Sequence, residues 1–303
     1  MGKLGFIGLG IMGKPMSKNL IKAGYRLVVY DIVKEAVAEV VAAGAEPAGS
    51  PREVAARCDK FITMLPNSPH VKEVVLGDNG IIEGAQQGSI LIDMSSIDPM
   101  VTREIAAKLK EKGIRMLDAP VSGGEPKAID GTLSIMVGGR QEDFDECYDI
   151  LKAMGASVVR VGDIGAGNVT KLANQIIVAL NIAAMSEALV LATKAGVEPE
   201  LVYQAIRGGL AGSAVLDAKA PLVMARKFNP GFRINLHIKD LANALAASHE
   251  VGVPLPLTAT VMEILQALKV DGLGDADHGA IIRFYEKLAQ VECQASSTTR
   301  PSR

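Results

Sequence analysis

The hydrophobic residues of this chain follow one pattern up to about residue 163 and another beyond it. In the first part, short apolar runs alternate with helical stretches, which is typical of a parallel sheet covered by helices on both faces. Beyond that point the apolar residues recur at helical spacing. The sequence therefore predicts an α/β protein, with a doubly wound, mostly parallel sheet followed by an all-helical second domain. We expect strands at residues 4–7, 27–30, 61–65, 90–93, 115–118, 134–137 and 158–161.

Glycine, proline and capping residues set the predicted boundaries. We assign residues 1–163 to the sheet domain and 164–292 to the helical domain, which begins with a long helix over about 168–195. Ser50, Ser68 and Asp98 each precede a proline and predict helix N-caps. Residues 293–303 are polar and rich in Ser and Thr, so we predict a disordered tail. Further helices are expected at residues 199–208, 214–225, 235–251, 256–270 and 277–291.

The first predicted strand leads directly into a glycine-rich turn and a helix. Gly8 allows the tight turn, Gly10 lets the backbone approach a pyrophosphate, and Gly13 lets the helix pack on the strand. Backbone N–H groups at the helix N-terminus would face the phosphates. The second strand ends at Asp31, about where an acidic residue meets the adenosine ribose. This order predicts a Rossmann-type dinucleotide site, with an ordinary strand-to-helix turn as the alternative.

Composition and charge exclude several classes of protein. The 303 residues carry a formal charge of −2, which creates no strong field toward nucleic acid or an anionic membrane surface. Cysteines and histidines show no metal-ligand spacing, so we expect inert thiols, no metal, and histidines at the surface or in helix packing. The chain enters a strand without a charged leader, so we expect a cytoplasmic protein. These residues are Cys58, Cys147, Cys293, His70, His237, His249 and His278.

A dinucleotide domain followed by a helical domain favours hydride transfer, which needs a group that gives a proton to the substrate oxygen. Lys171 lies one turn into the predicted long helix, at the junction where we expect a cleft between the domains. The positive end of the helix dipole and partial desolvation both disfavour an ammonium there, so this lysine should release its proton readily. Asn174 shares its helix face. The alternative is an ordinary solvated lysine.

Two further segments are candidates for substrate binding. Ser122, Gly123 and Gly124 follow the fifth predicted strand, at the edge of the sheet where ligands bind, and their backbone N–H groups can hold a small carboxylate. A turn that needs glycine for positive φ explains the same residues equally well. Lys239 and Asp240 form a charged pair on a predicted helix, and spacing alone favours a solvated ion pair there.

Taken together, these motifs resemble those of the β-hydroxyacid dehydrogenase family, which is related to 3-hydroxyisobutyrate dehydrogenase. The resemblance covers about residues 3–292 and rests on four motifs in order: residues 5–13, 118–124, 167–174 and the Lys239–Asp240 pair. Residues 63–71, 121–128 and 206–213 look most like the tartronate semialdehyde (2-hydroxy-3-oxopropionate) reductases of that family. The resemblance implies an NAD(P)-dependent oxidoreductase acting on CH–OH groups, with glucarate, galactarate or glyoxylate metabolism as its setting.

The resemblance also implies roles for individual residues. Lys171 would be the catalytic acid–base, with Asn174 beside it. Ile32 stands where many relatives carry an arginine for the 2′-phosphate, so NAD is expected, with NADP possible because Lys34 can partly compensate. Substrate-binding residues would be Ser122, Gly123, Gly124, Lys239 and Asp240, and cofactor-binding residues would be Gly8, Gly10, Ile11, Met12, Gly13, Asp31, Leu65, Pro66, Ser96 and Lys239.

The resulting hypothesis is reversible reduction of tartronate semialdehyde to D-glycerate by NADH or NADPH. The expected partners are a small carboxylate-bearing aldehyde or hydroxy acid and further copies of the chain. The resemblance also suggests a homodimer or homotetramer, because the long apolar helix and the helical domain offer more hydrophobic surface than one small domain can cover. Two alternatives stay open: a dehydrogenase of 3-hydroxyisobutyrate or another β-hydroxyacid, and a non-catalytic nucleotide-binding module.

Overall fold

The computed structural model describes residues 2–295 and divides into two compact units that meet between Leu172 and Ala173. The first unit contains a mostly parallel sheet, and the second, within the described residues, is built of helices. The predicted fold class is confirmed. The first unit extends beyond residue 163, where the hydrophobic pattern changes, into the first residues of the long helix α9 (Ala166–Lys194).

The sheet of the first unit has the strand order β3-β2-β1-β4-β5-β6-β8-β7, with β9 paired to β8. The strands from β3 to β6 in this order are parallel, which is the doubly wound arrangement of dinucleotide-binding sheets. β8 is antiparallel to β6 and β7, and β9 is parallel to β8. The strands are β1 (Lys3–Ile7), β2 (Arg26–Tyr30), β3 (Glu46–Pro47), β4 (Lys60–Thr63), β5 (Ile90–Asp93), β6 (Arg115–Asp118), β7 (Val121–Ser122), β8 (Leu133–Gly138) and β9 (Gly155–Gly162).

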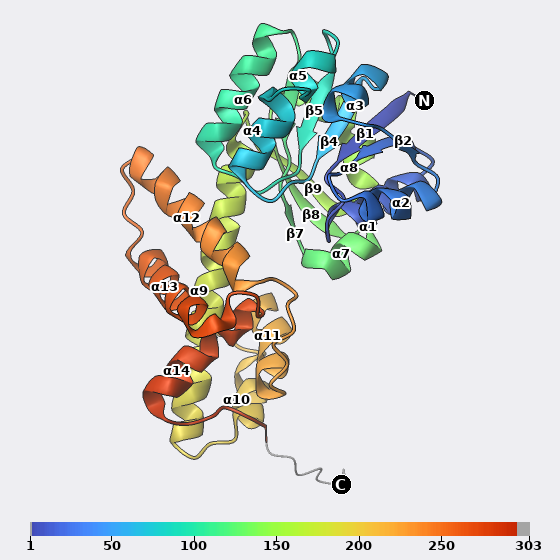
Figure 1. The fold of residues 1–303 in the computed structure, drawn as a ribbon. Coiled ribbons are helices and arrows are strands. Elements are labelled where there is room, and N and C mark those ends of the chain that lie inside the picture. Colours follow the sequence, from blue (N-terminus) through green and yellow to red (C-terminus); the bar gives the residue numbers. More distant parts are fainter. Residues whose placement is uncertain (1, 296–303) are drawn as a thin grey trace. The chain divides into compact units, whose positions relative to one another are not determined.

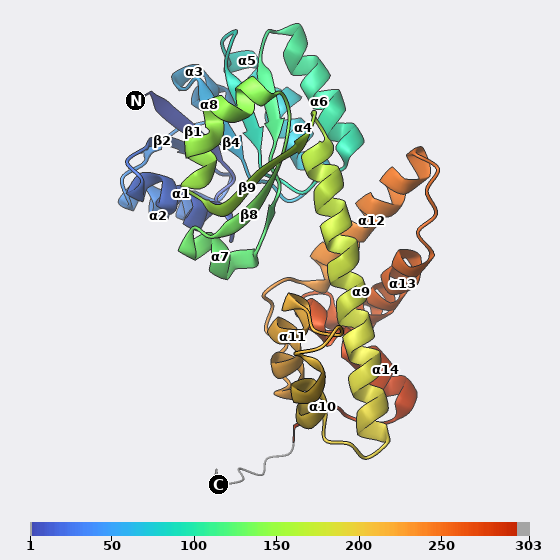
Figure 2. The ribbon, with the colours of Figure 1, turned by 180° about the vertical axis from the view of Figure 1, so that it is seen from behind.

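Residues of the sheet point alternately into two layers of helices. In β2, Leu27 and Val29 pack in the cluster that contains α1, α2, α7 and α8, whereas Val28 packs in the cluster that contains α3 to α6. Figures 1 and 2 show helices on both faces of the sheet. These helices are α1 (Gly13–Lys22), α2 (Lys34–Ala42), α3 (Pro51–Arg57), α4 (Ser68–Leu76), α5 (Ile81–Gly84), α6 (Pro99–Glu111), α7 (Gly124–Asp130) and α8 (Gln141–Lys152).

Two short strands and one helix cap differ from the prediction. β3 and β7 were not predicted, because a strand of 2 residues is too short to show a period in the sequence. The N-cap of α4 is Asn67, whose side chain accepts the N–H of Ser68 at 2.8 Å, so the cap predicted at Ser68 was wrong. Ser50 and Asp98 cap their helices as predicted, each accepting a backbone N–H group of the first turn.

The second unit packs several helices around the second half of α9. Buried Ile182, Leu241 and Leu265 place α9, α12 and α13 in one apolar core. The helix predicted at 256–270 ends at Leu268, and the one predicted at 277–291 consists of a 3₁₀ helix (His278–Ile281) followed by α14. The helices are α10 (Pro199–Ile206), α11 (Ala214–Met224), α12 (Ile234–Glu250), α13 (Pro256–Leu268) and α14 (Ile282–Ala289), with a π turn at Lys269–Leu273.

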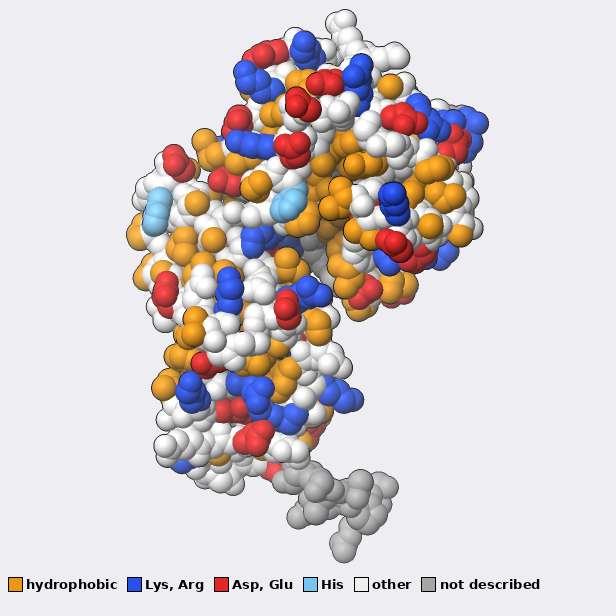
Figure 3. Space-filling model, in the orientation of Figure 1, with side chains coloured by type: hydrophobic (Ala, Val, Ile, Leu, Met, Phe, Trp, Pro, Cys, Tyr) orange, Lys and Arg blue, Asp and Glu red, His pale blue; other side chains and the backbone are white. Residues whose placement is uncertain are grey.

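The long helix α9 is unusually apolar. By length and composition alone it could cross a membrane, since a window of 18 residues has a mean hydropathy of 2.0. Its buried side chains, such as Ile182 and Leu189, belong to the core of the second unit. Ile177 and Leu191 are 61% and 72% exposed, so part of the helix is an uncovered apolar face. Figure 3 shows hydrophobic side chains among charged ones on the visible surface of both units.

The predicted disordered tail is wrong at its first residues. Cys293 is fully buried in the apolar core of the second unit, and its N–H donates to Glu286 Oε1 at 2.8 Å. The N–H of Ala295 donates to the carbonyl of Met224 at 3.3 Å. Because the segment is polar on average, its composition gave no indication that one apolar side chain fits the core. The remainder of the predicted tail, residues 296–303, lies outside the described residues.

Candidate active site

The glycine-rich turn after β1 has a different constraint at each glycine. Gly8 has a φ of +96°, and a Cβ there would lie 2.3 Å from the carbonyl oxygen of Met64. A Cβ on Gly13 would lie 1.9 Å from the carbonyl oxygen of Gly8, so this glycine lets α1 start close against the turn. A Cβ on Gly10 would meet nothing within 4 Å. The turn is therefore tight against the protein at two positions and open at the third, which leaves space for a ligand to reach the backbone.

Asp31, directly after β2, is bonded to the same turn. Its Oδ2 accepts the N–H of Leu9 at 2.5 Å, and its Oδ1 accepts the N–H of Val33 at 2.8 Å. A carboxylate has about four acceptor positions, so these bonds leave acceptor capacity for ribose hydroxyls. The next side chain, Ile32, is 86% exposed. The turn and Asp31 together fit a dinucleotide: space for a pyrophosphate at Gly10, and a carboxylate for the ribose.

The loops that follow β4 and β5 are bonded to each other at the same edge of the sheet. The N–H of Leu65 donates to Ser95 Oγ at 2.9 Å. Asp93, at the end of β5, accepts Thr63 Oγ1 at 2.9 Å and the N–H of Ser95 at 3.1 Å. Complete burial raises the pKa of Asp93 to about 6, although these hydrogen bonds oppose the shift. Leu65 and Ser96, both expected at the cofactor, therefore belong to two loops that a hydrogen bond holds at a fixed distance from each other.

The start of α9 is bonded to the end of β6, to the loop that follows β5 and to α6. The N–H groups of Gly165 and Asn168 each donate to the Asp118 carboxylate at 2.7 Å. The Asn168 side chain accepts the N–H of Ile97 at 3.1 Å and donates to Thr102 Oγ1 at 3.1 Å. Burial raises the pKa of Asp118, against the lowering effect of its hydrogen bonds. This network fixes the position of α9 one turn before Lys171.

Lys171 is buried, with 7% of its surface exposed. The alternative of an ordinary solvated lysine is therefore wrong, because its side chain lies within the protein. Asn174 is half-buried, and its Nδ2 donates to Gln175 Oε1 at 2.8 Å. Both residues lie on α9, and Lys171 belongs to the same unit as the glycine-rich turn.

Ser122, Gly123 and Gly124 form a junction between a strand and a helix. Ser122 ends β7, and Gly123 is the N-cap of α7 with a φ of 139°. Gly124 has a φ of +67°, so both glycines have the backbone conformation that the alternative of a simple turn requires. The short helix α7 begins at Gly124. Its first backbone N–H groups have no partner within the helix and point back toward the loop at Ser122.

Lys239 and Asp240 are not a solvated pair, although spacing alone favoured that explanation. Asp240 is 1% exposed, and its Oδ1 lies 2.9 Å from Lys239 Nζ. Its Oδ2 accepts Gln175 Nε2 at 2.6 Å. Gln175 was missed in the sequence, yet it follows Lys171 by four residues and so shares its face of α9. Sequence alone could not single it out, because nothing local indicates its contact with α12.

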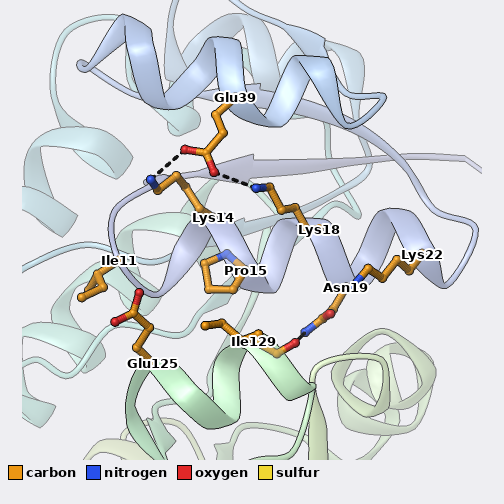
Figure 4. Close-up of a pocket in the computed structure, with 9 residues that line it drawn as sticks. All are labelled: Ile11, Lys14, Pro15, Lys18, Asn19, Lys22, Glu39, Glu125 and Ile129. Carbon is orange, nitrogen blue, oxygen red and sulfur yellow. Dashed lines mark hydrogen bonds and ion pairs between the residues drawn. The ribbon is translucent and has the colours of Figure 1, made fainter. Parts of the chain in front are cut away.

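A groove of about 250 Å³ lies on the outer side of α1, between α1 and α7. Figure 4 shows Lys14 and Lys18 of α1 directed at Glu39 of α2, with Glu125 of α7 on the opposite side. The two lysine hydrogen bonds lower the pKa of Glu39 to about 2. Ile11, beside Gly10, and Glu125, beside Gly124, both line this groove, so the glycine-rich turn and the loop at Ser122 lie near each other in the first unit.

Comparison with known proteins gives matches along nearly the whole chain. A family model described as the NAD binding domain of 6-phosphogluconate dehydrogenase matches residues 3–162. A second, described as NAD-binding of NADP-dependent 3-hydroxyisobutyrate dehydrogenase, matches residues 165–285. These matches meet near residue 163, whereas the compact units divide at Leu172, because Asn168 and its neighbours bond to Asp118 in the sheet.

Curated relatives and solved structures agree with these models. The chain is 44% identical to 2-hydroxy-3-oxopropionate reductase of Escherichia coli, over 95% of this chain and 98% of that protein. It is 40% identical to 2-(hydroxymethyl)glutarate dehydrogenase of Eubacterium barkeri, over 95% and 96%. A structure of Mycobacterium tuberculosis 3-hydroxyisobutyrate dehydrogenase with L-serine has a TM-score of 0.88 at 31% identity, covering 94% of this chain and 99% of that one.

The sequence similarity, the order of strands and the geometry of the glycine-rich turn lead to the same assignment. The relatives act, by their names, on small hydroxy or oxo acids. The chain belongs to the β-hydroxyacid dehydrogenase family related to 3-hydroxyisobutyrate dehydrogenase, whose members are NAD(P)-dependent oxidoreductases acting on a hydroxyl group.

Proposed function

We propose that this protein reduces tartronate semialdehyde (2-hydroxy-3-oxopropionate) to D-glycerate, reversibly, with Lys171 as the general acid. The observation that carries the proposal is the burial of Lys171 on a helix start that is bonded to β6 and to the loop after β5. The 44% identity to a 2-hydroxy-3-oxopropionate reductase supports the choice of substrate. When bound, a nicotinamide dinucleotide would supply the hydride, and Lys171 would give a proton to the carbonyl oxygen of the substrate.

The network around Asp118 would keep Lys171 in position during this step. Its two bonds to the N–H groups of Gly165 and Asn168 hold the first turn of α9. A lysine on a fixed helix loses little orientation between the free and the reacting state, which lowers the barrier to proton transfer. In the reverse direction the same side chain would accept the proton of the hydroxyl group. Asn174 would orient the substrate or Lys171 from the next turn of the same helix.

Substrate binding would use the charge of the acid. The backbone N–H groups of Ser122, Gly123 and Gly124 lie at the N-terminus of α7, where a carboxylate is stabilised. Lys239 adds a cation, held in place by its ion pair with Asp240. Each of these groups would favour a substrate that carries a carboxylate.

The cofactor residues favour NAD. Gly8, Gly10, Ile11, Met12 and Gly13 would surround the pyrophosphate. Leu65, Pro66 and Ser96 would also line the cofactor site. The carboxylate of Asp31 repels a 2′-phosphate, and the exposed Ile32 beside it offers no positive charge to attract one. We therefore expect tighter binding of NADH than of NADPH, and a titration of both cofactors followed by fluorescence measures the difference.

The uncovered apolar face of α9 supports an oligomer. Ile177 and Leu191 are largely exposed on a helix of otherwise high hydropathy, and contact with further copies would remove this surface from water. Light scattering after size exclusion distinguishes a homodimer or homotetramer from a single chain.

One set of assays tests the reaction and the role of Lys171. Wild-type rates are measured by NADH oxidation with tartronate semialdehyde and by NAD reduction with 3-hydroxyisobutyrate and 2-(hydroxymethyl)glutarate. The substrate assignment is wrong if either hydroxy acid has the higher kcat/KM. Lys171→Met should lower kcat by about 100-fold or more, with NADH affinity unchanged. Lys194→Met, an exposed lysine on the same helix, is the matched control and should retain wild-type rates.

A further inference from the structure

Two histidines of the second unit form a buried pair. His237 lies on α12 and His278 begins the 3₁₀ helix, and both are almost fully buried. Their Nδ1 atoms are 2.9 Å apart, a hydrogen-bond distance. The Phe232 ring packs against both imidazoles, with centroids 5.7 and 5.3 Å away. The sequence predicted histidines at the surface or in helix packing. It did not predict this direct contact between two of them.

The partners of His237 determine where its proton lies. Its Nε2 is 3.2 Å from the backbone oxygen of Gln175, which can only accept a hydrogen bond. His237 therefore carries a proton on Nε2, and in its neutral form Nδ1 is an acceptor. The Nδ1 of His278 must then donate. The geometry thus assigns one tautomer to each ring: Nε2–H for His237 and Nδ1–H for His278.

A second contact joins α9 and α12, one turn further along α12 than His237. Asp240 follows His237 by three residues and accepts the side-chain amide of Gln175 at 2.6 Å. Gln175 is thus held twice, by its backbone oxygen and by its side chain, and it is 4% exposed. Asp240 in turn lies 2.9 Å from Lys239 Nζ. A hydrogen-bonded series therefore runs from His278 through His237 and Gln175 to the Lys239–Asp240 pair.

We propose that His237 and His278 are positioning residues for Lys239. The donor on His278 fixes the ring of His237, which fixes the register of α12 on α9 at Gln175 and so the place of the Lys239 ammonium. This inference deepens the proposed function, since it takes Lys239 as a group that binds the substrate acid. Loss of the donor at His278 should move Lys239 and weaken substrate binding, with little effect on the dinucleotide residues of the first unit.

The test compares two substitutions of His278. His278→Asn keeps an N–H donor at the δ position, and His278→Leu has similar bulk without a donor. The full-length protein is assayed with whichever acid the wild type turns over best, so an error in the proposed substrate leaves this test intact. His278→Leu should raise the KM for the acid by about tenfold. NADH affinity should change less than the KM for the acid, because Lys239 is only one of the expected cofactor contacts, and His278→Asn should restore most of the lost binding. His249→Leu, an exposed histidine on α12, is the control.

Three results would overturn the proposal. One is an unchanged KM in His278→Leu. Another is an equal loss of binding in the Leu and Asn variants, which would indicate a packing role only. The third comes from ¹⁵N spectra of the wild-type imidazoles, which need no substrate and no variant. A proton on Nδ1 of His237 or on Nε2 alone of His278 contradicts the assigned tautomers.

Discussion

Two glycines of the turn after β1 should respond in opposite ways to the same added methyl group. A Cβ on Gly10 meets no protein atom within 4 Å, and this glycine is not among those with positive φ. Gly10→Ala should therefore fold normally, with a gain of about 0.4–1 kcal/mol from the less flexible unfolded chain. A Cβ on Gly13 would lie 1.9 Å from the backbone oxygen of Gly8, where no side chain can move aside.

Gly10→Ala, which should leave the fold intact, should weaken the binding of the cofactor. In Gly10→Ala the methyl group occupies the space that a pyrophosphate needs to reach the backbone. The loss of one hydrogen bond to a charged group costs about 1.5–3 kcal/mol. NADH should therefore bind roughly 10-fold to 150-fold more weakly. Gly13→Ala should instead lower the free energy of unfolding by at least about 1–3 kcal/mol, because α1 must move away from the turn.

Thermal unfolding followed by circular dichroism and titration of NADH fluorescence measure both effects. Gly208→Ala is the matched control, since its Cβ also meets nothing within 4 Å and it lies in the second unit. It should leave NADH binding unchanged and give the same small gain in stability, about 0.4–1 kcal/mol, because neither Gly10 nor Gly208 has a positive φ. NADH binding of wild-type strength in Gly10→Ala would refute the assignment of this turn to the pyrophosphate. A wild-type melting temperature in Gly13→Ala would refute the packing argument.

Two buried carboxyl groups give further predictions. The pKa of Asp93 is raised to about 6, so its protonated form stabilises the fold fully below the ordinary value near 3.8, and this contribution is lost as the pH rises through 6. Asp93→Asn should therefore remove up to about 3 kcal/mol of pH dependence between pH 4 and 7 in urea unfolding, and an unchanged slope would contradict the shift. Asp118→Asn replaces one acceptor oxygen by a donor facing the N–H of Gly165 or Asn168, which should cost about 1–3 kcal/mol of stability. It should also lower kcat, because the start of α9 moves with Lys171, and a variant that is destabilised with an unchanged kcat would separate the network from catalysis.

Local patterns predicted the parts of this protein that depend on neighbours in sequence. The apolar runs of β1, β2, β4, β5 and β6 are continuous because both faces of the sheet are covered, so they stand out from the amphipathic helices between them. Gly13 is required by a contact within the turn itself, with the carbonyl oxygen of Gly8, which the spacing of the motif already contains. Ser50 caps a helix through a bond to a residue three positions away.

Features without a local signal were missed or misjudged. The polar composition of residues 293–303 predicted that Cys293 belongs to a disordered tail, although its thiol fits the core of the second unit. β7 is too short to have a period, and Asn67 competes with Ser68 for the same cap. In each case the alternatives differ little in local energy, and packing against a distant segment decides between them.

The sequence by itself determined the α/β architecture, the dinucleotide turn and Lys171 as a candidate, because each depends on residue order and spacing, and the family resemblance added Lys239. Only the tertiary structure decided that Lys171 is buried and that the side chain of Lys239 is only 17% exposed. That outcome depends on Asp118 meeting Asn168, 50 residues away, and on Gln175 meeting Asp240, 65 residues away. Burial is a property of packed elements, so contacts between segments this far apart cannot be derived from the pattern of either segment.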